Sequence, residues 1–192
     1  MPVNLNDPRV KRTRQLMMQA FLEILEERKN IYSISVQDIA ARATVNRATF
    51  YAHFEDKYAF LESWMRDKFQ KKLEKELPNG ALSDMLSLKA LITSVFDFLS
   101  RTRQYMTPGD SPFEPLFEVA MQKELYLLLY NWLEKEKTAA STQIVETTAL
   151  VVSWGIFGSA LQWSRSPQRR LMDAMVQDVL FVAAASLAPV IG

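Results

Sequence analysis

The sequence of 192 residues contains no cysteine and a single histidine, His53. Without thiols the chain can form no disulfide and has no cysteine nucleophile. One imidazole cannot build a Cys/His metal cage and leaves none to spare for a catalytic triad. The P-loop, GxSxG and HExxH motifs are missing too. We therefore expect no enzymatic activity, no metal and no cofactor.

A long, uninterrupted apolar run is also missing. The longest candidate, residues 149–163, is broken by glycine, serine and glutamine, and it falls short of the ~20 residues that a membrane-spanning helix needs. Residues 1–15 lack the apolar stretch of a secretory signal. We expect a cytoplasmic protein with no membrane partner, and the lack of cysteine agrees with a reducing compartment.

Glycine and proline are scarce, with 5 and 8 residues, and the main breaks fall at residues 78–80, 107–112 and 164–167. The segments between these breaks repeat apolar residues at i, i+3, i+4 and i+7, which predicts an all-α fold. The expected helices are 8–29, 36–43, 47–53, 56–76, 83–103, 113–137, 141–164 and 167–188. A break of the sixth helix near Glu118 is left open. The early helices are compact and the later ones long, which indicates two domains, 1–57 and 58–192.

Residues 36–53 have the pattern of a helix-turn-helix. Two helices this short are unstable alone in water, so each must pack on something larger. The apolar residues available for burial are Val36, Ile39, Ala40 and Ala43 in the first helix and Val45, Phe50 and Phe54 around the second. Asn46 can cap the second helix by accepting a backbone N–H from its first turn.

Burial of Phe50 and Phe54 leaves one face of the second helix outward. Arg47 at its N-terminal end can reach the O6 and N7 edge of a guanine. Ala48 and Thr49 are small enough to let the helix approach a major groove. The available phosphate donors are Thr49, Tyr51, His53 and Lys57. The alternative is a solvated surface helix whose histidine is structural.

Basic residues crowd the start of the first helix. They are Arg9, Lys11, Arg12 and Arg14. The helix macrodipole disfavours cations in the first turn by roughly 0.3–1 kcal/mol each, so helix stability does not explain them, whereas a nearby phosphate backbone would. A flexible, solvated basic tail is the alternative. The net charge of the chain is only +1, so recognition of a nucleic acid would have to be local.

The segments SVQDIAARA (35–43), VNRATFYAHF (45–54) and the pair Asp56 and Lys57 resemble the DNA-binding signature of TetR-type (TetR/AcrR) transcriptional regulators. The likeness covers the first quarter to third of the chain. It implies an N-terminal three-helix helix-turn-helix domain that binds a double-stranded DNA operator. A larger helical domain for ligand binding and dimerisation would follow.

The resemblance also implies roles for single residues. Arg47 and Ala48 would face bases, and Thr49 would contact base or backbone. The residues placed toward phosphates are Ser35, Tyr51, His53 and Lys57, with Arg42 as a further candidate and Asn46 completing the DNA-binding set as the cap. Thr44 departs from the family, which usually has glycine there. If that turn needs a positive φ, a β-branched residue costs ~1 kcal/mol or more.

The last two helices carry small residues at close-packing spacing. The resemblance implies that they pair with their copies in a homodimer, which would place the reading helices ~34–36 Å apart, one turn of DNA. The candidate interface residues are Gly155, Gly158, Ser159, Gln162, Met175 and Val179. Packing of the same helices within one chain is the alternative.

Aromatic residues and methionine are plentiful after residue 80. A pocket lined by them would accept an apolar or aromatic small molecule. The candidate lining residues are Phe96, Phe117, Met121, Tyr130, Trp154 and Phe157. For each of them, plain core packing is the alternative.

The function expected from these patterns is that of a homodimeric transcriptional repressor. A small-molecule effector would release it from a palindromic operator. The alternative is a DNA-binding co-regulator of the same fold whose C-terminal domain binds a protein partner. The operator sequence, the effector and the choice between repression and activation stay open.

Overall fold

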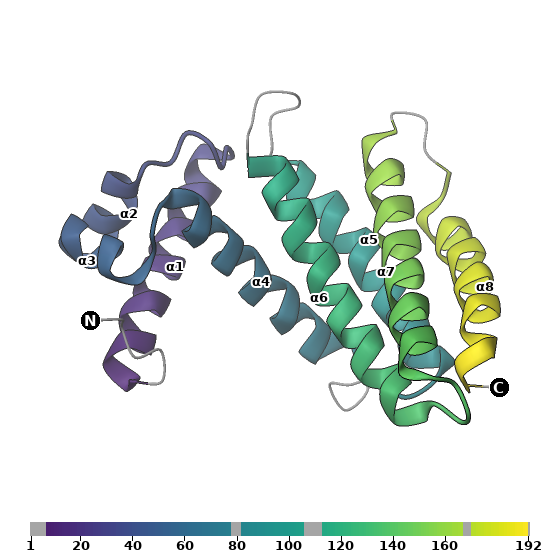
Figure 1. Cartoon of the computed structure of the whole chain (residues 1–192). Coiled ribbons are helices and arrows are strands. Elements are labelled where there is room, and N and C mark those ends of the chain that lie inside the picture. The colour runs from purple at the N-terminus through teal and green to yellow at the C-terminus, as the bar shows by residue number, and fades with distance from the viewer. Residues whose placement is uncertain (1–6, 78–81, 106–112, 167–169, 192) are drawn as a thin grey trace. The chain divides into compact units, whose positions relative to one another are not determined.

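The computed structural model describes residues 7–77, 82–105, 113–166 and 170–191, and every regular element within these ranges is an α-helix (Figure 1). The helices are α1 (Pro8–Arg28), α2 (Val36–Arg42), α3 (Arg47–His53), α4 (Lys57–Glu76), α5 (Met85–Arg103), α6 (Phe113–Glu136), α7 (Thr142–Arg165) and α8 (Met172–Ile191). The all-α prediction is confirmed, and the helix ends differ from the expected ones by a few residues. α6 continues through Glu118 without a break.

The chain forms two compact units. The first comprises Met1–Met65 and Arg103–Leu116, and the second comprises Arg66–Thr102 and Phe117–Gly192. The division falls inside α4, so this helix contributes its first part to one unit and its second part to the other. The predicted domain boundary between residues 57 and 58 stays a prediction.

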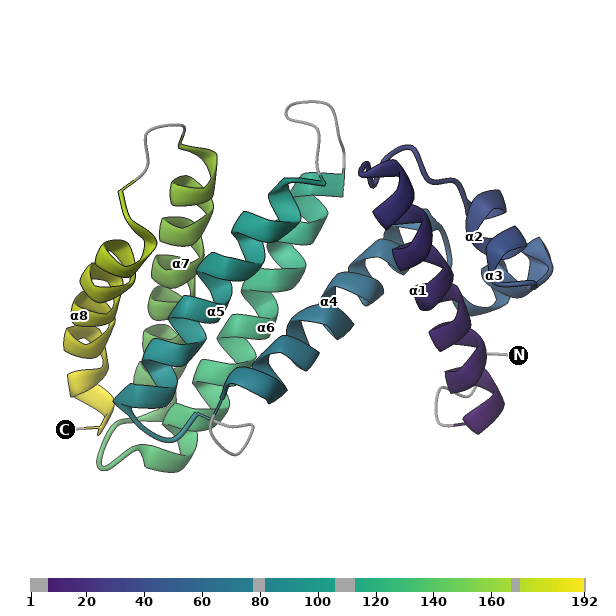
Figure 2. The ribbon, with the colours of Figure 1, turned by 180° about the vertical axis from the view of Figure 1, so that it is seen from behind.

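An aromatic cluster forms the core of the first unit, in which α1, α2 and α3 pack together (Figure 2). The ring centroids of Phe50 and Phe54 lie 5.4 and 5.0 Å from that of Phe60 in α4. Phe60 in turn lies 5.4 Å from Phe21 of α1. Because three helices share this cluster, tertiary packing holds the short α3 in place, as its length requires.

The second unit is a helical bundle made by the end of α4 and by α5 to α8. Apolar residues from successive helices fill its interior, including Leu91 of α5, Leu129 of α6, Val152 of α7 and Leu187 of α8, each at most 3% exposed. α8 lies beside α7 in both views (Figures 1 and 2).

α7 and α8 are more apolar than the sequence analysis allowed for. Windows of 18 residues in them reach mean hydropathies of 1.5 and 1.8, and both helices are long enough to cross a membrane. α7 is longer than the apolar run of residues 149–163 because the helix continues on both sides of that run and through its glycine and serine positions. One face of each helix is nevertheless buried in the bundle.

Candidate nucleic-acid interface

α3 is held from behind and presents its other face to solvent. Phe50 is fully buried, while Arg47, Ala48 and Tyr51 are exposed and Thr49 is half-buried. The Oδ1 atom of Asn46 accepts a hydrogen bond from the Ala48 N–H at 2.8 Å, so the N-cap expected from the sequence is present.

Arg47 and Tyr51 lie one helical turn apart and contact each other. Arg47 Nη2 donates to the Tyr51 hydroxyl at 3.2 Å, and the guanidinium carbon lies 5.6 Å from the ring centroid. This contact restricts the rotamers of a long side chain, so less conformational entropy is lost when the arginine binds a partner. The pair forms the most prominent donor group on the outer face of α3.

Ser35 is committed to capping α2. Its hydroxyl accepts from the Asp38 N–H at 3.1 Å and donates to Asp38 Oδ2 at 2.7 Å. Arg28 approaches the same carboxylate with two donors, each at 3.0 Å. The Arg28 guanidinium and the Ser35 hydrogen bonds hold the pKa of Asp38 well below its ordinary range. A phosphate contact by Ser35 would have to coexist with this capping box.

His53 and Lys57 are drawn into the fold more than the sequence indicated. Burial lowers the pKa of His53, and the nearby Arg14 lowers it further, so both effects favour the neutral imidazole. Its Nδ1 is buried without a hydrogen-bond partner among the described residues. Lys57 Nζ donates to the Tyr32 carbonyl at 3.1 Å. His53 is therefore a weaker cationic partner for a phosphate than an exposed histidine would be, and Lys57 offers its two remaining N–H groups.

Two other arginines are committed to contacts within the chain. Arg42 makes a bidentate ion pair with Glu27, both N–O distances being 2.9 Å. Arg14, unlike the exposed Arg9 and Arg12, is half-buried. Sequence reasoning missed these assignments because the acceptors lie on other helices, 15 residues or more away in the chain.

The turn between α2 and α3 has the conformation that glycine favours. Thr44 has a φ of 53°, inside the left-handed region. The turn is closed by hydrogen bonds from the Thr44 N–H to the Ala41 carbonyl at 3.2 Å and from the Val45 N–H to the Ala40 carbonyl at 3.0 Å. The condition set out for Thr44 is therefore met, and this β-branched residue is strained.

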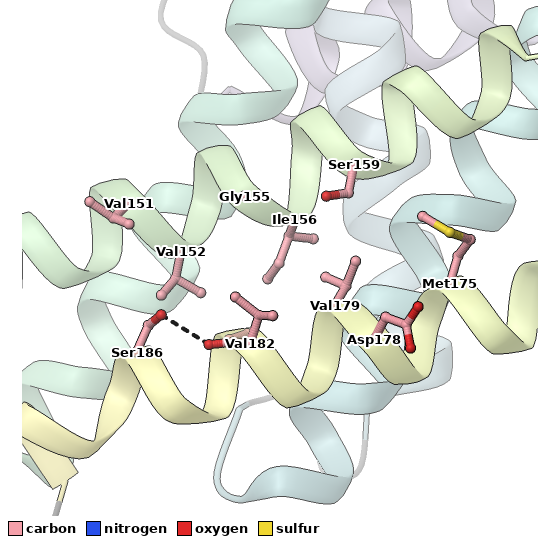
Figure 3. Close-up of a pocket in the computed structure, with 11 residues that line it drawn as sticks. Val151, Val152, Gly155, Ile156, Ser159, Met175, Asp178, Val179, Val182 and Ser186 are labelled. Carbon is pink, nitrogen blue, oxygen red and sulfur yellow. Dashed lines mark hydrogen bonds between the residues drawn. The ribbon is translucent and has the colours of Figure 1, made fainter.

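In the second unit, an apolar groove of 320 Å³ runs between α7 and α8 and is open to solvent. Figure 3 shows Val152 and Ile156 of α7 opposite Val179 and Val182 of α8. Four of the six predicted interface residues line it: Gly155, Ser159, Met175 and Val179. Gln162 is exposed and Gly158 half-buried outside the lining.

Comparison with known proteins bears on the first unit most directly. Residues 25–63 match the family model described as "Bacterial regulatory proteins, tetR family". Over 60 residues the chain is 37% identical to "Uncharacterized HTH-type transcriptional regulator YxbF" of Bacillus subtilis (strain 168). This stretch is 31% of the present chain and spans only 16% of the length of that relative. Residues 25–63 are therefore similar to the DNA-binding region of TetR-family regulators.

Solved structures extend the likeness to the whole fold. The repressor AlkX from Dietzia sp. Strain DQ12-45-1b has a TM-score of 0.60 at 15% identity, with 99% of this chain and 100% of that chain covered. A TetR variant from Acinetobacter baumannii AYE, solved in complex with minocycline, has a TM-score of 0.56 at 22% identity, covering 91% and 93%. At these identities the likeness concerns the fold alone.

The predicted ligand-lining residues do not form one set in the structure. Phe96, Phe117, Met121 and Phe157 are at most 2% exposed in the bundle interior. Tyr130 is half-buried and its ring stacks on that of Tyr126 at 5.9 Å between centroids. Trp154, by contrast, is 49% exposed on α7 and points away from the core. A pocket role for these residues stays a prediction.

The groove contains residues that the sequence analysis missed. They are Val151, Val152, Ile156, Asp178 and Val182, whereas Ala183 and Ser186, which also line the groove, belong to the stretch of small residues in the last helix that the sequence indicates. The available signal was the spacing of three and four residues along each helix, which places them on the same faces as the predicted interface residues.

A second hollow, of 580 Å³, lies between α4, α5 and the start of α8, where Asp97 is ion-paired with Lys72 and Arg101.

Replacement of Thr44 by glycine should stabilise the protein. Relief of left-handed strain is worth ~1–3 kcal/mol, and the added freedom of glycine in the unfolded chain takes back ~0.5–1 kcal/mol, so a net gain of about 1 kcal/mol is expected. Urea denaturation would measure it. Thr44→Ala is the control, since it removes the hydroxyl and keeps the strained Cβ. Equal stability of the glycine and alanine variants would contradict the strain.

Replacement of Asp38 by asparagine should remove a pH dependence. The pKa of Asp38 is lower in the folded chain than its ordinary value of 3.8, so its stabilisation is complete above that value and is lost as the pH falls through the folded value. Asp38→Asn should therefore lower the free energy of unfolding most at pH 7. The difference from wild type should shrink below about pH 4. Denaturation curves that keep a constant separation down to pH 2 would contradict this role.

Proposed function

We propose that this TetR-family regulator is a homodimeric transcriptional repressor that binds a palindromic operator through α3 and is released by an apolar or aromatic small molecule. The observation that carries the proposal is the two-sided character of α3. Buried Phe50 fixes the helix from behind, while Arg47, Ala48 and Tyr51 are exposed on the opposite side. A helix presented in this way suits the major groove.

The roles on α3 follow from reach and chemistry. Arg47 lies in the first turn, where a guanidinium can donate two hydrogen bonds to guanine O6 and N7. Ala48 adds no bulk, and Thr49 can touch a base or the backbone. The Tyr51 hydroxyl accepts from Arg47 and keeps its own proton to donate to a phosphate. Arg47 therefore distinguishes one base pair from another, and Tyr51 helps to fix the position of the protein along the DNA.

Dimerisation through the outer faces of α7 and α8 is supported by apolar exposure. Val182 is 62% exposed, Phe181 78% and Trp154 49%, in addition to the apolar groove. A Cβ built on Gly155 would meet nothing within 4 Å, so packing inside one chain does not require glycine there. The close approach of a second copy would explain why a residue without a side chain stands at position 155, and it would remove the apolar face from water.

Release by an effector requires a route from the second unit to α3. The chain leaves α5 directly into Tyr105, whose carbonyl accepts from the Ile31 N–H at 3.1 Å in the turn before α2. Lys29 Nζ lies 5.7 Å from the Tyr105 ring centroid. A shift of the C-terminal end of α5 would therefore be transmitted to the helix-turn-helix through the contacts of Tyr105 with Ile31 and Lys29. A coupling of ~1–3 kcal/mol would weaken operator binding about 5- to 150-fold.

The second candidate function is a co-regulator that binds a protein instead of a small molecule. The exposed apolar faces of α7 and α8 would equally suit such a partner. The minocycline complex of the Acinetobacter baumannii relative favours the small-molecule version by analogy of fold. A library of apolar and aromatic compounds separates the two, because only the first version predicts release of bound DNA by a compound.

Selection from random duplex DNA tests the proposal, and Arg47→Ala sharpens it. Wild type should enrich a palindromic sequence. Arg47→Ala should bind it more weakly by ~1–3 kcal/mol and lose its preference at one base pair of each half-site, because one base contact is removed. Lys57→Ala, as a phosphate variant, should weaken selected and random duplexes alike. No enrichment by wild type, or equal losses for both variants on both DNAs, would refute this assignment.

Val182→Asp should convert the proposed dimer into a monomer. A carboxylate on an exposed helix position leaves the fold of one chain intact, whereas it is costly inside a dry interface. Sedimentation at micromolar concentration would measure the effect. Leu86→Asp is the matched control, because Leu86 is 68% exposed on α5 and does not line the groove between α7 and α8. A wild-type protein that sediments as a monomer would rule out the dimer.

A further inference from the structure

Arg14 of α1 connects three helices of the first unit at one end of α3. Its Nη1 donates to the His53 carbonyl at 3.1 Å, and its Nη2 donates to Ser63 Oγ of α4 at 2.7 Å. The guanidinium carbon lies 4.1 Å from the centroid of the Phe54 ring, over its face. Both ends of the guanidinium fork and one of its faces are thus used inside the protein.

These contacts distinguish Arg14 from the other cations at the start of α1. Arg9, Lys11 and Arg12 are exposed, whereas Arg14 is half-buried, and burial lowers its pKa, although an arginine stays protonated. The interpretation of all four as phosphate ligands therefore does not apply to Arg14. Its charge lies against the last carbonyl groups of α3, where the helix macrodipole favours a cation.

The location matters because α3 has only seven residues. Its N-terminal end is fixed by the Asn46 cap and by the turn hydrogen bonds around Thr44. At its C-terminal end the final carbonyl groups have no partner within the helix. Arg14 supplies the His53 carbonyl with a donor and packs on Phe54, so it fixes the direction in which the axis of α3 points.

We propose that Arg14 is a positioning residue for DNA recognition, which fixes the C-terminal end of α3 against α1 and α4 and so aligns Arg47 with base edges. The inference rests on the proposed DNA-binding function. A small rotation of α3 would move Arg47 out of bidentate geometry and leave exposed cations near phosphates. Loss of Arg14 therefore reduces discrimination between sequences and spares the non-specific, electrostatic part of binding.

The salt dependence of DNA binding tests this assignment. We would measure DNA affinity for wild type, Arg14→Gln, Arg14→Lys and the matched control Arg12→Gln. Each protein is tested on the selected duplex and on a random duplex between about 50 and 200 mM salt, a range over which phosphate contacts change the affinity strongly. Loss of one phosphate contact lowers the slope of log K against log salt by about 0.9. Arg12→Gln should do so on both duplexes.

Arg14→Gln should leave the slope at its wild-type value and reduce the preference for the selected duplex by about 5- to 150-fold, the range expected for a lost bidentate base contact. Arg14→Lys should behave like Arg14→Gln, because an ammonium keeps the charge but not the fork or the stacking. A slope lowered by about 0.9 in Arg14→Gln, or full recovery in Arg14→Lys, would identify Arg14 as a phosphate ligand and overturn the proposal.

Ser63→Ala guards against a trivial loss of folding. It removes one acceptor of Arg14 and leaves the others, so its circular dichroism should match wild type and its preference should fall in the same direction by a smaller factor. An unchanged preference in Ser63→Ala and Arg14→Gln, with wild type still selective, would reject this inference alone. A wild type that selects no sequence would instead reject the DNA-binding function on which the inference rests.

Discussion

The burial of Phe50 is the interaction on which the rest of the first unit depends. A seven-residue helix does not persist in water by its own hydrogen bonds. Its position is therefore set by what its buried side packs against, and that is the ring cluster shared with Phe21, Phe54 and Phe60. Because the cluster includes rings from α1, α3 and α4, packing fixes the position of α3 while its outward face remains exposed.

The distribution of cations around this core separates structure from recognition. Arg28, Arg42 and Arg14 each use their guanidinium forks on partners within the chain. Arg47 contacts only its neighbour on the same helix face among the described residues. The exposed pairs contribute little to stability in high dielectric, typically ~0–1 kcal/mol. Their main effect is to fix the geometry of α2 and α3 and to leave a small number of donors facing outward.

The second unit has the opposite character. Not all of its apolar residues are buried in its core, and α7 and α8 have large exposed apolar side chains such as Val151, Trp154 and Phe181. An apolar face of this kind is unfavourable in water and is typical of a surface that is covered in the working assembly. The proposed dimer accounts for that face, and it would give the two-fold symmetry that a palindromic operator requires.

The sequence by itself determined the all-α fold, the helix-turn-helix and the buried side of α3. These are local properties, because periodicity, capping and turn chemistry act over a few neighbouring residues. Only the tertiary structure decided which cations are committed, since Arg14 and Ser63 are 49 residues apart in the chain and Lys57 and Tyr32 are 25 apart. The tertiary structure also shows that Trp154 faces outward while Phe157 faces the core. An apolar residue is buried only where another helix packs against it, and the periodicity within one helix does not specify which helix that is.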